Sequence, residues 1–298
     1  MRQEQPFFSI VVPTYARPKQ LAACLRALAL LEYPRDHFEV IVIDDGSETP
    51  PEDVVAPLRD RLDVTLLTQP NAGPAAARNT GAAEARGEFL AFTDDDCAPA
   101  PDWLQRLAAR FAAAPDPMIG GRTLNVLNDN PYSTASQLLI AYLYGYFNAD
   151  PSQARFFASN NLALSAQRFQ TIGGFDATYT RAAAEDRELC DRWLLRGYRM
   201  IYAPEVLIYH AHALTFRTFW RQHFTYGKGA FCFHQARARR GQRRIRAEPR
   251  WFYPNLLRYP FLQVRGRRAL LFAVLLVMSQ GAHTVGYLGE AMNRARRR

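Results

Sequence analysis

Three adjacent aspartates, Asp94, Asp95 and Asp96, directly follow a short apolar run, Phe89-Leu-Ala-Phe-Thr. Carboxylates this close repel one another, so placing them at the end of a strand costs free energy unless a cation offsets their charge. Oxygen ligands of this kind suit Mg²⁺ or Mn²⁺ bound together with the phosphates of a substrate. The triplet therefore predicts a site for a metal and a phosphate, and a solvated acidic turn is the alternative interpretation.

Two further polar segments occupy comparable positions. Asp44 and Asp45 follow another apolar run, where carboxylates can accept hydrogen bonds from a nucleoside, although an ordinary turn is the favoured explanation when they are taken alone. The segment Asn71–Gly81 predicts a helix that carries Arg78 about one turn in. Arginine beside the end of a strand suits a phosphate group, and a plain surface arginine is the alternative.

The elements around these residues alternate in type along the chain. Later in the chain we predict strands at 158–164, 200–202 and 206–209. Within the first 93 residues we predict strands at 9–12, 38–43, 64–67 and 88–93, and helices at 19–31, 51–60 and 74–85. Alternation at this spacing indicates a doubly wound α/β sheet. Ligands of such sheets bind beyond the carboxyl ends of the strands, which is where the acidic clusters lie.

Charge divides the chain near residue 215. The chain has 37 basic and 28 acidic residues. Residues 216–298 contain 18 of the basic residues and two of the acidic ones, so this segment has a net charge of about +16, and residues 1–215 have about −7. A strongly basic segment needs an anionic partner, and membrane phospholipid and nucleic acid are the two candidates. The four scattered cysteines form no CxxC pair, which fits a reducing compartment, and the first residues lack the pattern of a signal peptide. We therefore expect a cytoplasmic protein.

The segment Ala269–Gly289 contains 21 residues without a charge, which is just long enough to span a bilayer. Only its first half is uniformly apolar, and Ser279, Gln280, His283 and Thr284 would form a polar stripe on a helix. This pattern favours a helix that lies in the membrane interface or inserts shallowly over one that spans it. Packing of the same helix against the rest of the chain is the alternative.

Six segments together resemble family 2 glycosyltransferases of the GT-A fold. In order, they are Val12-Pro13-Thr14-Tyr15, Asp44-Asp45-Gly46-Ser47, Asn71–Gly81, Thr93-Asp94-Asp95-Asp96, Gly173-Gly174-Phe175-Asp176 and Glu185-Asp186. The resemblance implies a Rossmann-like mixed sheet flanked by helices. It also implies a catalytic domain over 1–215, with a nucleotide-sugar half at 8–100 and an acceptor half at 101–215. The basic segment 216–298 would be a helical, membrane-associated extension.

The resemblance also implies roles for individual residues. The nucleotide would contact Pro13, Thr14, Tyr15, Asp44, Asp45, Arg78, Asp94 and Asp95. A divalent metal, Mn²⁺ or Mg²⁺, would be held by Asp94, Asp96 and His210, which fits the family spacing better than His212. Asp186 would be the catalytic base, with Glu185 helping to place the acceptor. The sugar and acceptor pocket would include Asn160, Asn161, Gly174 and Trp193, although an aromatic residue on a helix is more often a core residue.

The function implied is transfer of a sugar, with inversion, from a nucleoside diphosphate donor to a glycan or lipid-linked acceptor. A UDP-sugar is the favoured donor. The expected location is the inner face of the cell membrane, with residues 216–298 on its anionic surface, and nucleic acid is not an expected partner. A nucleotidyltransferase that makes a sugar nucleotide, and a non-catalytic module that binds a nucleotide sugar or a lipid, are the alternatives.

Overall fold

The computed structural model of the chain describes residues 5–241 and 248–296, so part of the predicted basic extension, 242–247, lies outside the described residues. The chain divides into two compact units. The first comprises the chain up to Leu124, together with Asn148–Thr180 and Asp186–Ala211. The second comprises Asn125–Phe147, Arg181–Glu185 and the chain from His212 onward. The second unit therefore includes a segment from the middle of the sequence as well as the basic C-terminal part.

The first unit is built on a mixed sheet, which in the described residues has eight strands in the order β3-β2-β1-β4-β7-β6-β8-β5. The strands are β1 (Phe8–Thr14), β2 (Phe38–Asp44), β3 (Val64–Thr68), β4 (Phe89–Phe92), β5 (Cys97–Pro99), β6 (Met118–Asn125), β7 (Leu162–Ser165) and β8 (Met200–His210). Strand β1 pairs in parallel with β2 and β4, and β2 pairs in parallel with β3. Strand β7 pairs antiparallel with β4. The predicted α/β fold with a mixed sheet is confirmed.

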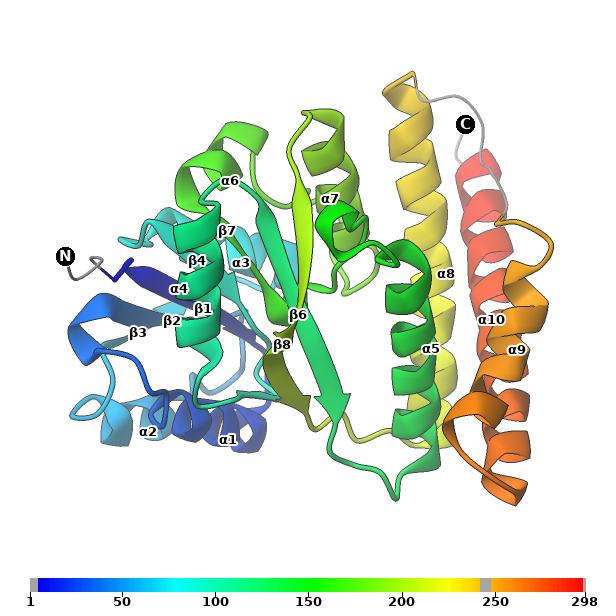
Figure 1. The fold of residues 1–298 in the computed structure, drawn as a ribbon, viewed down its shortest axis with the longest axis horizontal. Helices are drawn as coiled ribbons and strands as arrows, with labels where there is room; N and C mark the ends of the chain where they lie inside the picture. The colour runs from blue at the N-terminus through cyan, green and yellow to red at the C-terminus, as the bar shows by residue number, and fades with distance from the viewer. Residues whose placement is uncertain (1–4, 242–247, 297–298) are drawn as a thin grey trace. The chain divides into compact units, whose positions relative to one another are not determined.

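Helices cover both faces of this sheet (Figure 1). They are α1 (Pro18–Leu28), α2 (Glu52–Val55), α3 (Pro74–Ala83), α4 (Trp103–Ala113), α6 (Ala166–Ile172) and α7 (Glu185–Leu195), with short 3₁₀ turns at Arg35–His37, Ala56–Leu58, Pro151–Gln153 and Ser159–Asn161. Helices α1, α2 and α4 share one apolar cluster with Ile10 and Val12 of β1. Helix α3 lies on the opposite face, because a Cβ at Gly81 would meet the side chains of Val11 and Ile43. Successive residues of a strand point to opposite faces, so each face of β1 has its own helical cover.

The elements differ from the prediction in three places. The predicted helix at 51–60 is the short α2 followed by a 3₁₀ turn that contains Pro57. The strand expected from residue 158 begins only at Leu162, after the 3₁₀ turn Ser159–Asn161. The two short strands predicted at 200–202 and 206–209 are one strand, β8, which runs without a break through Pro204.

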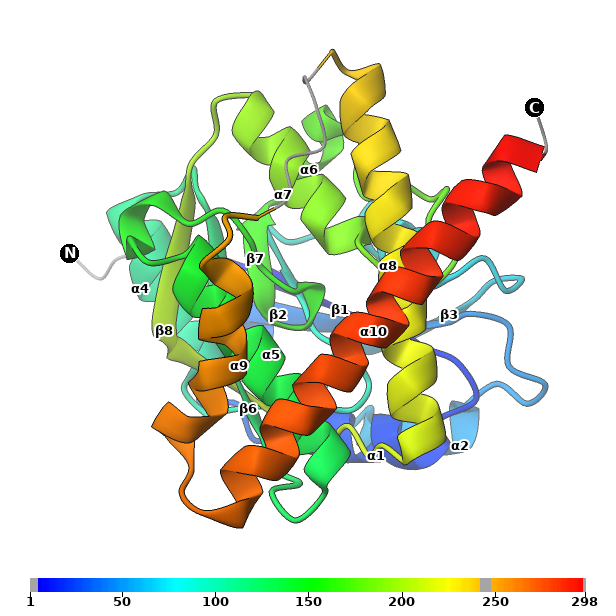
Figure 2. The same cartoon turned by 90° about the vertical axis from the view of Figure 1, so that its right-hand side faces the viewer.

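The second unit is helical. Its helices are α5 (Pro131–Phe147), α8 (Phe216–Arg239), α9 (Phe252–Gln263) and α10 (Arg267–Arg296). Helices α8 and α10 cross at very short range (Figure 2). A Cβ on Gly227 would lie 1.9 Å from the carbonyl oxygen of His283, and one on Gly286 would lie 2.0 Å from that of Phe224. Glycine is therefore required at both positions for the two backbones to approach.

Helix α10 is long enough and apolar enough to cross a membrane. Among the described residues, no other helix is both. Its most apolar stretch is 39% buried inside the protein. The polar residue Ser279, part of the predicted polar stripe, is fully buried on α10 and donates its hydroxyl to the carbonyl of Leu276. The face of α10 that packs against the protein thus contains part of the predicted polar stripe.

Candidate active site

The acidic triplet lies at the edge of the sheet where the parallel strands end. Thr14, the last residue of β1, pairs with Asp44 at the end of β2 and donates its hydroxyl to Asp95 Oδ2 at 2.8 Å. The backbone N–H of Thr93, which follows β4, donates to the carbonyl of Val11. Since parallel strands end at one edge of a sheet, residues from three separate segments meet there.

Arg17 holds two of the three carboxylates. Its guanidinium lies 2.6 Å from Asp95 Oδ1 and 2.9 Å from Asp96 Oδ2, and it is 39% exposed while both aspartate side chains are almost completely buried. Burial raises the pKa of Asp95 to about 7 even though Arg17 opposes the shift, and Asp96 raises it further. The buried carboxylates Asp95 and Asp96 therefore need a nearby cation if both are to be ionised. Sequence reasoning missed Arg17, although a cation three residues beyond the end of a strand was the available signal.

Asp94 pairs with the arginine of helix α3. Arg78 donates from Nη2 to Asp94 Oδ1 at 2.7 Å, and its side chain is buried. The Arg78 guanidinium also lies over the ring of Phe175, 5.5 Å from its centroid. Helix α3 begins after Gly73, which has a φ of +92° and whose Cβ would clash with the backbone of Thr180. The predicted arginine and the first aspartate of the triplet thus lie together at the edge of the sheet.

The two aspartates that follow β2 have different surroundings. Asp45 accepts hydrogen bonds from Gln69 Nε2 and from the backbone N–H groups of Ala72 and Gly73, so both of its oxygens hold the loop before α3. Asp44 is fully buried, and its Oδ2 has no hydrogen-bond partner within the described part of the chain. Asp45 is therefore occupied by a structural role in this arrangement, and Asp44 has unused acceptor capacity.

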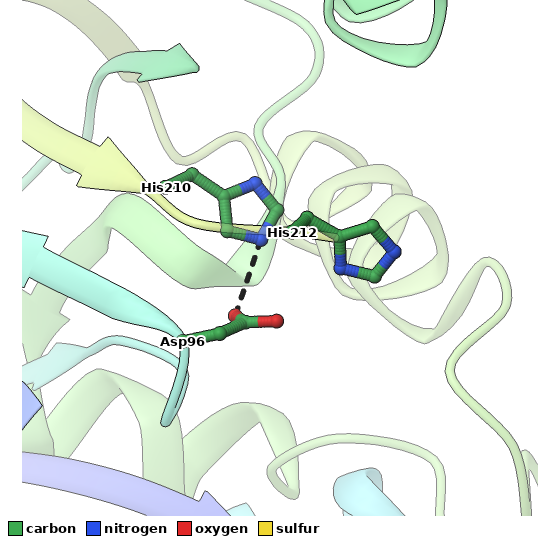
Figure 3. Close-up of side chains that lie close together, drawn as sticks. All are labelled: Asp96, His210 and His212. Atoms are coloured by element: carbon green, nitrogen blue, oxygen red, sulfur yellow. Dashed lines mark hydrogen bonds and ion pairs between the residues drawn. The ribbon is translucent and has the colours of Figure 1, made fainter. Parts of the chain in front are cut away.

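Asp96 meets His210 through the pairing of β5 with β8. The register places Cys97 opposite His210, and Asp96 Oδ1 lies 3.1 Å from His210 Nε2 (Figure 3). Burial disfavours the charged imidazole, but the hydrogen bond and the charge of Asp96 outweigh it, so the pKa of His210 is raised. A carboxylate oxygen beside an imidazole nitrogen is a donor set that fits a divalent transition metal such as Mn²⁺. His212, also drawn in Figure 3, belongs to the second unit.

Helix α7 begins with the two acids proposed for the acceptor side. Asp186 lies half-buried in its first turn, and its Oδ1 accepts the backbone N–H of Arg187 at 2.7 Å. Glu185 is buried and accepts the backbone N–H of Ala183 at 2.7 Å, next to Ala184, whose φ of +69° is unusual for a residue with a Cβ. The turn before the helix is thus held in an uncommon conformation by Glu185 itself.

A continuous series of contacts connects α7 to the acidic triplet. Arg192 of α7 donates to the carbonyls of Ile172 and Gly174. Asn79 of α3 accepts the N–H of Phe175 and donates to its carbonyl, and a Cβ on Gly174 would lie 2.6 Å from Asn79 Oδ1. The next residue before Asn79 is Arg78, which binds Asp94. The glycine turn, which the sequence assigned to the sugar and acceptor pocket, thus ties α7 to the edge of the sheet.

The sequence comparison decides the family. Residues 9–185 match the family model described as Glycosyl transferase family 2. The chain belongs to this family. The resemblance seen in the six motifs is confirmed, and the protein is a glycosyltransferase.

Curated relatives that match the chain are named as glycosyltransferases. The chain is 27% identical over 241 residues to Glycosyltransferase AglE of Haloferax volcanii, covering 77% of this chain and 74% of that one. It is 30% identical over 237 residues to Validoxylamine A glucosyltransferase of Streptomyces hygroscopicus subsp. jinggangensis, covering 70% and 52%. It is 32% identical over 200 residues to Pre-mycofactocin glycosyltransferase of Mycobacterium tuberculosis, covering 65% and 42%. The chain thus spans about half or less of the last two relatives.

Solved structures of similar shape support the GT-A fold. The mannosyltransferase PcManGT from Pyrobaculum calidifontis, in complex with GDP-Man and Mn²⁺, has a TM-score of 0.64 at 21% identity over 99% of this chain and 81% of that one. Residues 1–349 of TarS from S. aureus, in complex with UDP-GlcNAc, have a TM-score of 0.55 at 18% identity over 97% and 92%. At sequence identities this low, the similarity to these structures shows a shared fold only.

Three residues assigned to the pocket of this family 2 glycosyltransferase are buried in the protein. Trp193 is fully buried and donates its indole N–H to the carbonyl of Arg199, which is the environment of a core residue. Asn161 accepts the indole N–H of Trp103 and donates to the carbonyls of Arg122 and Val206, which uses its hydrogen-bonding capacity within the protein.

Asn160 is the other buried asparagine of that pair, and it bonds to Thr123 and Cys97. Both asparagines therefore have structural partners. By contrast, Pro13 is half-buried, and Tyr15 exposes 52% of its surface just past the end of β1. Tyr15 is accessible to a ligand at this edge without any rearrangement of the core.

Proposed function

We propose that this glycosyltransferase moves a sugar, with inversion at the anomeric carbon, from a nucleoside diphosphate to a hydroxyl acceptor. One observation carries the proposal. Asp96 and His210 form an oxygen and nitrogen pair beside two further carboxylates, and helix α7 with Asp186 is tied to that same edge of the sheet. Asp96, proposed to bind the metal, and Asp186, proposed to remove the proton, therefore lie on elements that are linked by hydrogen bonds.

Asp96 and His210, with Asp94, would hold a divalent cation, Mn²⁺ or Mg²⁺. The donor chemistry supports this, because buried carboxylates already recruit Arg17 to offset their charge. When bound, the ion would stabilise the negative charge that develops on the departing diphosphate. The similar structure of PcManGT contains Mn²⁺ with GDP-Man, which is consistent with this role.

The nucleotide would lie against the ends of β1 and β2. Tyr15 is exposed and suited to contact the base, while Thr14 and the unused acceptor of Asp44 suit polar contacts to the nucleoside. Arg78 would approach the phosphates from α3. We propose a UDP-sugar as the donor. GDP-Man in PcManGT and UDP-GlcNAc in TarS make the comparison of UDP with GDP the first binding experiment.

Asp186 would act as the general base. A positioned carboxylate that takes the proton of the acceptor hydroxyl makes it a competent nucleophile. The hydroxyl must then attack from the side opposite the leaving group, and one displacement of this kind inverts the anomeric configuration. Glu185 would keep the preceding turn in place through its bond to Ala183, and so position Asp186 and the acceptor.

We further propose that the enzyme works at the cytoplasmic face of the cell membrane on a glycan or a lipid-linked acceptor. The net charge of about +16 on 216–298 supports attachment to anionic lipid. Family membership favours sugar transfer over synthesis of a sugar nucleotide, which would release pyrophosphate, and over a non-catalytic binding module. A gel-shift assay is expected to show no specific nucleic-acid complex.

Replacing Asp186 with Asn tests the assignment of the base. We expect transfer to fall by about 10²- to 10⁴-fold while donor affinity stays the same, because the amide keeps the shape but cannot take a proton. Asp191→Asn, in the same helix α7, is the matched control and should retain transfer. Calorimetric titration of the donor and a coupled assay of nucleoside diphosphate release give both readouts. Unchanged turnover in Asp186→Asn would remove this residue from its proposed role.

A further inference from the structure

One face of α10 is apolar and exposed along most of the helix. Seven apolar residues at helical spacing each expose between 45% and 60% of their surface: Leu270, Leu271, Val274, Val277, Val285, Leu288 and Met292. Between the two halves of this set lie Gly281, where an added Cβ would meet no atom within 4 Å, and the exposed Thr284, whose hydroxyl donates to the carbonyl of Gln280. We call these residues the outer face of α10. An apolar face of this length is unusual on a water-soluble surface and indicates a binding partner.

The opposite face of α10 is already packed inside the second unit. Its buried residues are Ala269, Phe272, Leu275, Leu276, Ser279, Ala282 and Gly286. Phe272 and Leu275 share an apolar cluster with Phe219 of α8. Gly227 and Gly286 bring the two backbones together where α8 and α10 cross (Figure 2), and Arg294 in the last turn of α10 still donates to Gln235 of α8.

Helix α8 is too polar to enter the hydrocarbon of a bilayer. It carries Arg217, Arg221, Lys228 and, in its last turn, Arg237 and Arg239. If α10 crossed a membrane while it kept its contacts with α8, these cations would be moved into the hydrocarbon, which costs several kcal/mol for each charge. Only the outer face of α10 is therefore available to lipid.

Positive charge lies at both ends of this face. Arg265, Arg267 and Arg268 are exposed where α10 begins, and Arg296 is exposed in its last turn. Phe261 and Leu262, beside the first group, expose 52% and 67% of their surfaces. Arginines beside exposed aromatic and aliphatic side chains match the phosphates and acyl chains of an anionic bilayer surface. A second copy of this chain would bring similarly charged ends together, which is unfavourable.

We propose that α10 lies in the plane of an anionic membrane surface, with its outer face at the boundary between headgroups and acyl chains. The contact would extend over about 33 Å, since the outer face covers 22 residue steps of helix. The inference rests on the proposed membrane attachment and adds to it the segment, the face and the orientation. The second unit alone makes this contact, so the inference requires no assumption about the donor or the acceptor.

Vesicle flotation of the full chain tests the face. The probe is a vesicle of phosphatidylcholine with about 30% phosphatidylglycerol in about 0.1 M NaCl. We expect wild type to float, and Val274→Glu/Val277→Glu to bind at least about tenfold more weakly, because two apolar contacts become charges that the anionic surface repels. Leu30→Glu is the matched control, since Leu30 is 62% exposed and lies in the first unit. This variant should float like wild type.

The outcomes separate the inference from the membrane attachment on which it rests. If wild type does not float, the attachment fails and the inference fails with it. If wild type and Val274→Glu/Val277→Glu float equally, attachment stands and the outer face is not the contact. If wild type is a dimer in sedimentation equilibrium without vesicles and the double variant is a monomer, the face binds a second copy and the proposal is overturned. Leu288→Gln provides a second variant at an exposed position.

Depth measurements test the orientation. Spin labels on cysteines introduced at Leu270, Val277 and Leu288, in a Cys232→Ser background, report immersion through collisions with oxygen and with a polar nickel complex. Cys232 is half-buried, whereas Cys24, Cys97 and Cys190 are buried and protected from the label. A helix in the plane of the membrane places the three labels at one shallow depth. A deep middle label between two shallow ones would show a spanning helix and would contradict the proposal.

Discussion

Replacing Arg17 with Ala should destabilise the metal-free enzyme. Arg17 pairs with Asp95 and Asp96, whose side chains are 3% and 4% exposed, so the substitution leaves buried carboxylates without their cation. Breaking a buried ion pair costs about 3–5 kcal/mol. The Arg17 side chain is 39% exposed, so solvent screening reduces the expected loss to about 1–3 kcal/mol.

Urea unfolding of wild type and Arg17→Ala, in EDTA and in about 1 mM MnCl₂, measures this loss. We expect the difference in unfolding free energy to shrink in MnCl₂, because a cation on Asp96 replaces the charge of Arg17. Arg106→Ala is the control, since it breaks a single pair with Asp102 on the surface and should leave stability unchanged. The reasoning is refuted if Arg17→Ala is as stable as wild type in EDTA, or if MnCl₂ leaves the difference unaltered.

Two further predictions concern the second unit. Burial, with His283 and His212 adding to it, lowers the pKa of His223 to about 3. The unfolded chain therefore binds a proton at His223 below about pH 6.5, and the folded chain does not. The free energy of unfolding should fall by about 2 kcal/mol from about pH 7 to about pH 5, and urea unfolding of His223→Gln should not show this fall. Gly286→Val should cost about 2 kcal/mol or more in thermal unfolding, because its Cβ would lie 2.0 Å from a backbone oxygen of α8, whereas Gly289→Val meets open space and should not.

The edge where the acids gather could be predicted from the sequence. Apolar runs alternating with helical segments specify parallel strands, and the carboxyl ends of such strands lie on one side. Asp44 and Asp94 therefore had to lie at the same edge, whatever the details of packing. The pairing of Arg78 with Asp94 follows the same logic, because α3 leads from that edge.

Other features depend on tertiary contacts that no local pattern contains. The position of Arg17 just beyond a strand indicates a strand-end cation, but its carboxylate partners are about 80 residues away along the chain, so no local pattern identifies them. Trp193 and Asn161 have side chains typical of sugar sites, and the structure shows that the indole and the amide are occupied by internal hydrogen bonds. The close crossing of α8 and α10 is set by Gly227 and Gly286, which in sequence weaken a helix prediction.

The central claim is that Asp96 and His210 hold a cation that binds the diphosphate of the donor. Calorimetric titration of UDP and GDP into wild type and Asp96→Asn, with Mn²⁺ and with EDTA, tests it most directly. The account predicts that one of the two nucleotides binds wild type at least about tenfold more tightly with Mn²⁺ than without, and that Asp96→Asn removes this gain. Nucleotide binding that is equally tight in EDTA, or a Mn²⁺ gain retained in Asp96→Asn, would contradict the account.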